Sequence, residues 1–249
     1  MHNTIYFIQK ISFIYKGDKK MKLQHNIRVK GNSNAVDIIS DAMKLIENFS
    51  IYEEDNLMDR GNELDDIASK ILADNNCTGP YIDIIRIVKQ DDFLIQAAYL
   101  EDSIKALLLV DEHKKIYKAN THRLIIISKF VYDRYFLEKS RFIIAHEYAY
   151  FILFGNGISR FAHKYQSTNK SNIRENQANT LARCLLMPRL KVHELIKSMC
   201  SSDDDITSDK LIGMVAKTFG VTPKVANQRL DELGYIGITG GKGRGEAAS

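Results

Sequence analysis

Residues 141–154, RFIIAHEYAYFILF, place two neighbouring ionisable side chains, His146 and Glu147, inside a run that is otherwise almost wholly apolar. The run contains no glycine or proline and stops at Gly155, a residue suited to the left-handed C-cap of a helix. The pattern therefore predicts a buried helix. Because a buried ionisable group costs free energy unless it has a partner, His146 and Glu147 require a specific reason to be there.

The pair matches the first half of HExxH, a motif of zinc peptidases. In that motif, two histidines at positions i and i+4 share one helix face and bind the metal, and the glutamate beside the first activates water. Here the i+4 position is Tyr150, so the motif reads HEYAY. The first ligand and the base are present, and the second ligand is replaced.

Composition describes an ordinary globular protein. The chain has 249 residues, of which 45% are hydrophobic, enough for one large domain or a domain with appendages. Its net charge of +4 is well below that of a dedicated nucleic-acid binder. The cysteines form no CxxC pair, which argues against a disulfide framework or a thiolate zinc site; they are Cys77, Cys184 and Cys200. Without a cleavable signal or a membrane-length apolar run, we expect a cytoplasmic protein with no membrane contact.

Hydrophobic spacing before the motif predicts helices and then a small sheet. Residues 1–20 suit a strand or hairpin, residues 35–51 suit a helix, and an acidic linker follows. Two further helices are expected at residues 64–73 and 81–90. Short segments rich in aliphatic and β-branched residues then predict three strands, at residues 93–100, 104–110 and 124–128, with a hairpin turn at 111–115.

After the motif, residues 155–172 have the polar, glycine-containing composition of a loop. A second buried helix is expected at residues 172–187, bearing Glu175 and stopped by Pro188. Another helix is expected at residues 190–199. A helical pair then fills the C-terminal part, and residues 237–249 have the composition of a disordered tail.

Three segments, in their order and spacing, resemble the ImmA/IrrE family of zincin-type metallopeptidases of bacteria and their mobile elements. They are RFIIAHE at 141–147, ENQANTLARCLLMP at 175–188 and FGVTPKVANQRLDELGYI at 219–236. The resemblance implies an α+β, zincin-like fold with a small sheet, a buried motif helix and a helical C-terminal part. We therefore expect an N-terminal extension at 1–61, a zincin-like domain at 62–200, a helical pair at 201–236 and a tail at 237–249.

The resemblance also implies a zinc site. It makes His146 the first ligand, Glu147 the general base and Glu175 the third ligand. A catalytic zinc uses three protein ligands and an open position for water. Tyr150 matches the missing histidine, and a neutral phenol with a pKa of about 10 is a poor ligand. One lost ligand weakens zinc binding by about 3–4 kcal/mol. We expect little tightly bound zinc, weak or absent proteolysis, and a polar cluster in which Tyr150 donates to a carboxylate.

Two other histidines allow a functional and an ordinary interpretation. His163 could be a replacement ligand, but its position in the expected loop favours a surface histidine. His193 and Glu194 repeat the His-Glu pair, but Lys197 stands at the i+4 position. This second pair indicates an exposed helix face.

The resemblance implies an endopeptidase that cleaves a helix-turn-helix repressor in mobile-element or stress regulation. One alternative is a pseudopeptidase that binds such a partner without cutting it. Another is a DNA-binding regulator, because residues 214–230 fit a helix-turn-helix pattern that would read DNA through Lys224, Asn227, Gln228 and Arg229. For this helical pair we favour packing on the domain over DNA contact.

Overall fold

The computed structural model describes residues 6–7, 28–29, 61–100, 103–113, 121–134, 136–158, 160–166, 173–200 and 207–236. The helix expected at 35–51, the acidic linker and the tail at 237–249 lie outside these residues. Within the N-terminal extension, β1 (Tyr6–Phe7) pairs antiparallel with β2 (Arg28–Val29), so the region expected to hold a strand contains a short one.

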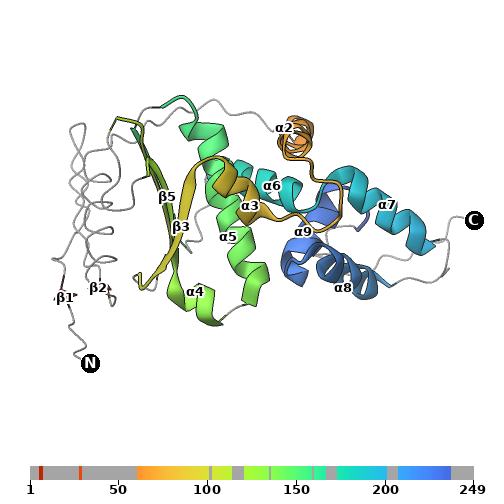
Figure 1. Ribbon diagram of the computed structural model, residues 1–249. Coiled ribbons are helices and arrows are strands. Elements are labelled where there is room, and N and C mark those ends of the chain that lie inside the picture. The colour runs from red at the N-terminus through yellow and green to blue at the C-terminus, as the bar shows by residue number, and fades with distance from the viewer. Residues whose placement is uncertain are drawn as a thin grey trace, which may run out of the picture.

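A four-stranded sheet forms one layer of the described domain, at the left of the coloured part of Figure 1. Its strands lie in the order β3 (Phe93–Ala98), β5 (Arg123–Ser128), β4 (Ile104–Asp111) and β6 (Arg160–Gln166). β3 is parallel to β5, whereas β4 is antiparallel to both of its neighbours. β3, β4 and β5 confirm the three strands that the aliphatic runs of the sequence predicted.

The edge strand β6 corrects the expectation of a loop at residues 155–172. It pairs with β4 so that His163 lies opposite Leu108 and Tyr165 opposite Ala106. Ring-bearing residues alternate along the sequence at positions 161, 163 and 165, which is the period of a strand. This short signal is flanked by glycine-containing and polar residues, and the flanking composition led to the wrong prediction.

The helix α5 (Phe136–Tyr150) packs along one face of the sheet (Figure 1). It begins before the expected residue 141 and continues into a π-helical turn, η1 (Phe151–Gly155). The short helix α4 (Lys129–Arg134) precedes it. The core between sheet and helix is aliphatic and aromatic and includes Ala106, Leu108, Ile125, Ile127, Ile144 and Tyr148.

The other helices lie on the side of α5 away from the sheet, with α7, α8 and α9 at the far end in Figure 1. Their bounds agree in position with the predicted helices: α2 (Gly61–Asp74), α3 (Ile84–Gln90), α6 (Ile173–Leu186) and α7 (Arg189–Cys200). α6 packs against both α5 and α2. The motif helix is therefore enclosed between the sheet and α6.

The C-terminal pair consists of α8 (Ser208–Phe219) and α9 (Pro223–Glu232). The turn between them uses Gly220 in the left-handed conformation, with φ of 60°. Arg141 of α5 donates to the carbonyl oxygens of Phe219, at 2.9 Å, and of Gly220. A Cβ atom at position 220 would lie 2.5 Å from Arg141 Nη1, so the close approach requires glycine.

Arg229 on α9 points into the protein, which fits the favoured interpretation of packing rather than the alternative of DNA reading. Its Nε donates to the carbonyl oxygen of Met187 at 3.1 Å, and its guanidinium pairs with the carboxylate of Asp65. Only 2% of Arg229 is exposed. Lys224 and Gln228 are exposed and Asn227 is partly exposed, so the side of α9 that carries Arg229 is committed to packing.

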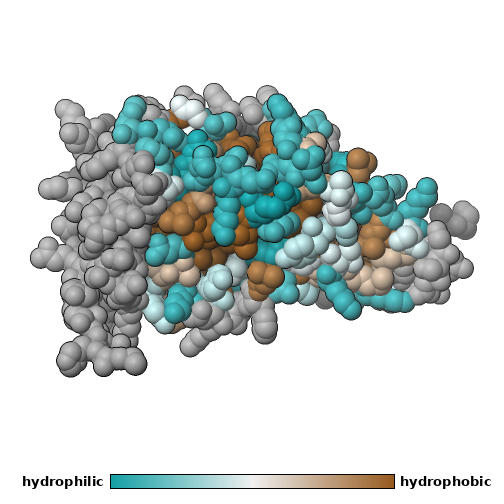
Figure 2. Space-filling view, in the orientation of Figure 1, coloured by the Kyte–Doolittle hydropathy of each residue, from teal (hydrophilic) through white to brown (hydrophobic). Residues whose placement is uncertain are grey.

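The surface in Figure 2 mixes hydrophilic and hydrophobic residues, with a hydrophobic area left of centre. Among the described residues, the exposed large hydrophobic side chains belong to several different elements; they include Tyr81, Leu94, Phe130, Leu137, Ile173, Leu190 and Met214. Across the described ranges, none of the helices has both the length and the apolar character needed to cross a membrane.

Candidate metal centre

The buried face of α5 that meets α6 carries His146. Its Nδ1 atom lies 3.0 Å from Asn179 Oδ1, and its Nε2 atom lies 3.3 Å from Glu175 Oε2. His146 is completely buried, whereas 28% of the Glu175 side chain is exposed. His146 and Glu175, which the resemblance makes the first and third ligands, therefore lie in direct contact.

His163 of β6 joins the same cluster, and this corrects the prediction of a surface histidine. Its Nδ1 atom lies 2.8 Å from Glu147 Oε2, and its Nε2 atom lies 2.8 Å from Glu175 Oε1. Only 7% of its side chain is exposed. The two carboxylates attract the imidazole, and the strand register turns it toward the helices.

Tyr150 packs its ring on His163, with ring centroids 3.5 Å apart and planes 18° apart. Burial, reinforced by the negative charge of Glu175, raises the pKa of the Tyr150 phenol to about 12, although Arg174 acts in the opposite direction. The phenol is therefore neutral near pH 7 when no metal is bound. Its hydrogen bond to a carboxylate stays a prediction.

The cluster favours a positive charge between its carboxylates. Burial alone would lower the pKa of His163, but Glu147 and then Glu175 outweigh burial and raise the pKa to about 9. For Glu175, burial alone would raise the pKa, but the contacts of its carboxylate with His146 and His163 lower the pKa to about 2. Carboxyl groups thus surround imidazole groups in a water-poor site, and the same arrangement would attract a metal cation.

Two buried atoms indicate that the cluster is incomplete without a further group. Within the part of the chain that the structure describes, His146 Nε2 and Glu147 Oε1 have no well-oriented hydrogen-bond partner. One donor atom from each of His146, Glu147 and His163 lies within 4.8 Å of the others. Imidazole nitrogens and carboxylate oxygens are zinc ligands, so the residues present fit a zinc ion.

Aromatic rings enclose the cluster. The Tyr165 ring centroid lies 4.2 Å from that of His146, and Phe154 in the π-helical turn lies 4.8 Å from Tyr150. π-helical turns within α-helices often occur at functional sites. Here the turn brings Phe154 against the residue that replaces the second motif histidine.

The second His-Glu pair is an exposed helix face, as expected. His193 and Glu194 are both exposed on α7. The His193 ring bonds the Tyr235 hydroxyl at 2.7 Å, and Lys191 donates to Glu194 at 3.0 Å. Neither of these bonds involves a residue of the buried cluster, so His193 and Glu194 are suitable positions for control substitutions.

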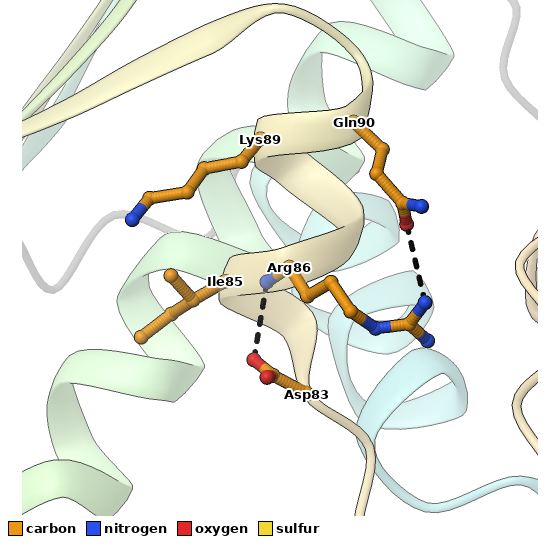
Figure 3. A pocket seen from close by; sticks show the side chains of 5 residues that line it. All are labelled: Asp83, Ile85, Arg86, Lys89 and Gln90. Carbon is orange, nitrogen blue, oxygen red and sulfur yellow. Dashed lines mark hydrogen bonds between the residues drawn. The ribbon is translucent and has the colours of Figure 1, made fainter.

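A surface pocket of about 330 Å³ lies elsewhere, along α3 (Figure 3). Its lining residues come from one short stretch: Asp83, Ile85, Arg86, Lys89 and Gln90. In Figure 3 the Arg86 backbone bonds Asp83, and its side chain reaches Gln90. Asp83 and Gln90 thus both accept hydrogen bonds from Arg86, and none of the residues that line the pocket belongs to the buried cluster.

Residues 110–231 match the family model described as the IrrE N-terminal-like domain, Peptidase M78. No curated protein matches the chain. The matched range runs from the end of β4 to α9 and contains every residue of the buried cluster. It agrees with the resemblance seen in the sequence and with a mixed α+β, zincin-like fold.

Proposed function

Because residues 110–231 belong to the Peptidase M78 family of IrrE N-terminal-like domains, we propose that the chain is a zinc-dependent endopeptidase of this kind. The observation that carries the proposal is the buried cluster in which His146 and Glu147 of the motif helix meet Glu175 of the second helix. His146 and Glu175 would hold the ion. When bound, zinc supplies Lewis acidity toward a peptide carbonyl and lowers the pKa of a coordinated water.

Glu147 is the residue placed to move the proton. Its Oε2 atom accepts a hydrogen bond from His163, while its buried Oε1 atom has no partner within the described residues. Oε1 would accept a proton from the attacking water and pass it to the amine that leaves when the peptide bond breaks. Asn179 holds the His146 ring through Nδ1, which keeps Nε2 directed to the site.

The activity we propose is weaker than that of a site with an intact HExxH motif. His163 already occupies one oxygen each of Glu147 and Glu175, and the bulky ring of Tyr150 lies against it. These contacts must rearrange or be shared when water and substrate enter. The same closed hydrogen-bond arrangement favours a second candidate, a pseudopeptidase that binds its partner without cutting it.

As the partner we propose a helix-turn-helix transcriptional repressor, encoded in a mobile element or stress operon of a bacterium and met in the cytoplasm. The support is the resemblance to the ImmA/IrrE family over its three sequence motifs. Direct DNA regulation by this chain is disfavoured, because Arg229, one of the four side chains expected to read DNA, is buried against Asp65.

The experiment pairs the purified chain with candidate helix-turn-helix repressors and follows fragments by mass spectrometry. We expect slow, zinc-dependent cleavage at one site, reduced at least 100-fold by Glu147→Gln because the general base is lost. Glu194→Gln changes the exposed member of the other His-Glu pair and should leave the rate unchanged. Stable binding without fragments would support the pseudopeptidase instead, and neither binding nor cleavage would contradict the proposed partner.

A further inference from the structure

The buried histidine on β6 has no counterpart in the helix motif. We propose that His163 supplies the second imidazole ligand of the metal centre, in place of the histidine that Tyr150 replaces on α5. The inference rests on the proposed function and specifies its ligand set as His146, His163 and Glu175.

Both imidazole rings are held in the orientation of metal ligands. Metal-binding histidines usually bond a carboxylate or carbonyl group through the ring nitrogen that does not bind the metal. His146 Nδ1 lies 3.0 Å from Asn179 Oδ1, and His163 Nδ1 lies 2.8 Å from Glu147 Oε2. The remaining Nε2 atom of each ring is directed to the same carboxylate, that of Glu175.

The separations suit donors of a shared ion. At zinc bond lengths of about 2.0–2.2 Å, atoms bound to one ion lie roughly 3–3.5 Å apart. His146 Nε2 lies 3.3 Å from Glu175 Oε2, and His163 Nε2 lies 2.8 Å from Glu175 Oε1. Small shifts of side chains are enough to bring the second separation into this range. His146 Nε2 also lacks a well-oriented hydrogen bond within the described residues, so an ion would satisfy a buried donor atom.

Tyr150 acts in this account as a positioning residue. Its ring lies parallel to the His163 ring at 3.5 Å and covers one face of it. Tyr150 on α5 therefore supports the imidazole of His163 from β6. In a complete HExxH motif, the helix position of Tyr150 would itself carry an imidazole. Tyr150 on α5 and His163 on β6 thus contact each other at one site.

The test is zinc binding by the full chain after removal of metal, followed by calorimetry and by metal content after dialysis. We expect one zinc per chain, rather than the little bound zinc expected from the sequence, because His163 replaces the missing ligand. In His163→Ala we expect a loss of two to three decades of affinity, as for any one ligand. His193→Ala removes an exposed histidine and should bind as the unmodified chain does. Circular dichroism would establish that each variant is folded.

The outcomes separate this inference from the proposed function. Unchanged affinity in His163→Ala, together with loss of zinc in His146→Ala, overturns His163 as a ligand and leaves a zinc-dependent peptidase standing. Absence of zinc binding by the unmodified chain overturns both.

A second measurement avoids any effect of substitution on folding. The unmodified chain, labelled with ¹⁵N-histidine, is loaded with ¹¹³Cd, and scalar couplings from the metal to ring nitrogens are recorded. Coupling to His146 and His163, each through Nε2, is the expected result. Coupling to His146 without His163 contradicts the proposal.

Discussion

Tyr150 stands where the zinc-peptidase motif has an imidazole, and its chemistry at that position is set by burial. Its pKa is raised to about 12, so it offers a neutral hydroxyl near pH 7. The stacking of its ring on His163 uses the aromatic face rather than the oxygen. A phenylalanine at position 150 would keep this aromatic face but lack the hydroxyl. The substitution therefore distinguishes a packing role of Tyr150 from a role as metal ligand.

We therefore predict that Tyr150→Phe keeps its zinc affinity within about threefold, because ring stacking is retained. Tyr150→Ala should lose about tenfold, because a stacked aromatic pair contributes about 0.5–1.5 kcal/mol. Tyr150→His, which completes HExxH, should bind zinc more tightly than the unmodified chain. Calorimetric titration measures all three, and loss of metal in Tyr150→Phe would show that the tyrosine oxygen is a ligand.

The charges around His163 predict a pH dependence of the metal-free protein. Because its pKa is raised from 6.5 to about 9, its stabilising effect is complete below pH 6.5 and is lost as the pH rises through 9. The lowered pKa of Glu175 acts oppositely: its stabilisation is present above pH 4.5 and is lost as the pH falls through about 2.

From these directions, the free energy of unfolding should fall by about 1–3 kcal/mol between pH 6.5 and pH 9.5. Urea denaturation in the presence of a chelator measures this change. His163→Gln removes the titrating group and should flatten the dependence over that range. Equal slopes for the two proteins would mean that another group causes it.

The sequence was sufficient to predict His146, Glu147 and Glu175 as candidate site residues, because two motifs place them at fixed positions on helices. It was not sufficient for His163, which reaches the cluster through the pairing of β6 with β4. Strand pairing is a long-range property, and one histidine in a short polar segment carries no local sign of its partner. The alternation at residues 161, 163 and 165 was the available signal.

At the scale of elements, α9 shows how a recognition-helix pattern can serve packing. Arg229 is buried and bonds Asp65 of α2 and the carbonyl of Met187. Arg189 bonds the same carboxylate from a half-exposed position, at 2.9 Å. Substituting each arginine therefore allows a buried and a half-exposed ion pair with the same Asp65 carboxylate to be compared.

We predict that Arg229→Ala destabilises the protein by about 3–5 kcal/mol, because it removes the buried guanidinium that pairs with Asp65 and donates to the Met187 carbonyl. Arg189→Ala should cost less than about 1 kcal/mol, since solvent replaces an exposed pair. Chemical denaturation gives both values. Similar costs would contradict the assignment of α9 to the core.

Helices and strands were predicted correctly where the hydrophobic pattern of the sequence extended over several residues. The aliphatic runs of β4 and β5 and the spacing of α6 were predicted, because each repeats over several residues. The π-helical turn at Phe151–Gly155 and the early start of α5 were missed. Both depend on how residues pack across the helix end, which a hydrophobic pattern does not specify.

Across the whole molecule, the candidate site needs three elements that are distant in the sequence. α5 supplies His146 and Glu147, β6 supplies His163, and α6 supplies Glu175 and Asn179. The family match begins at residue 110, yet α2 packs on α6 and so supports one wall of the site from outside the matched range. The domain bounds proposed from the sequence, with the zincin-like part starting at residue 62, stay a prediction.

We conclude that α5, β6 and α6 together form a zinc site. A crystal structure of the full chain grown with zinc, with diffraction recorded above and below the zinc absorption edge, tests it most directly. The account predicts one anomalous peak bonded to His146, His163 and Glu175, with Tyr150 stacked on His163. A cluster without an anomalous peak, with His163 still bridging Glu147 and Glu175, would contradict it.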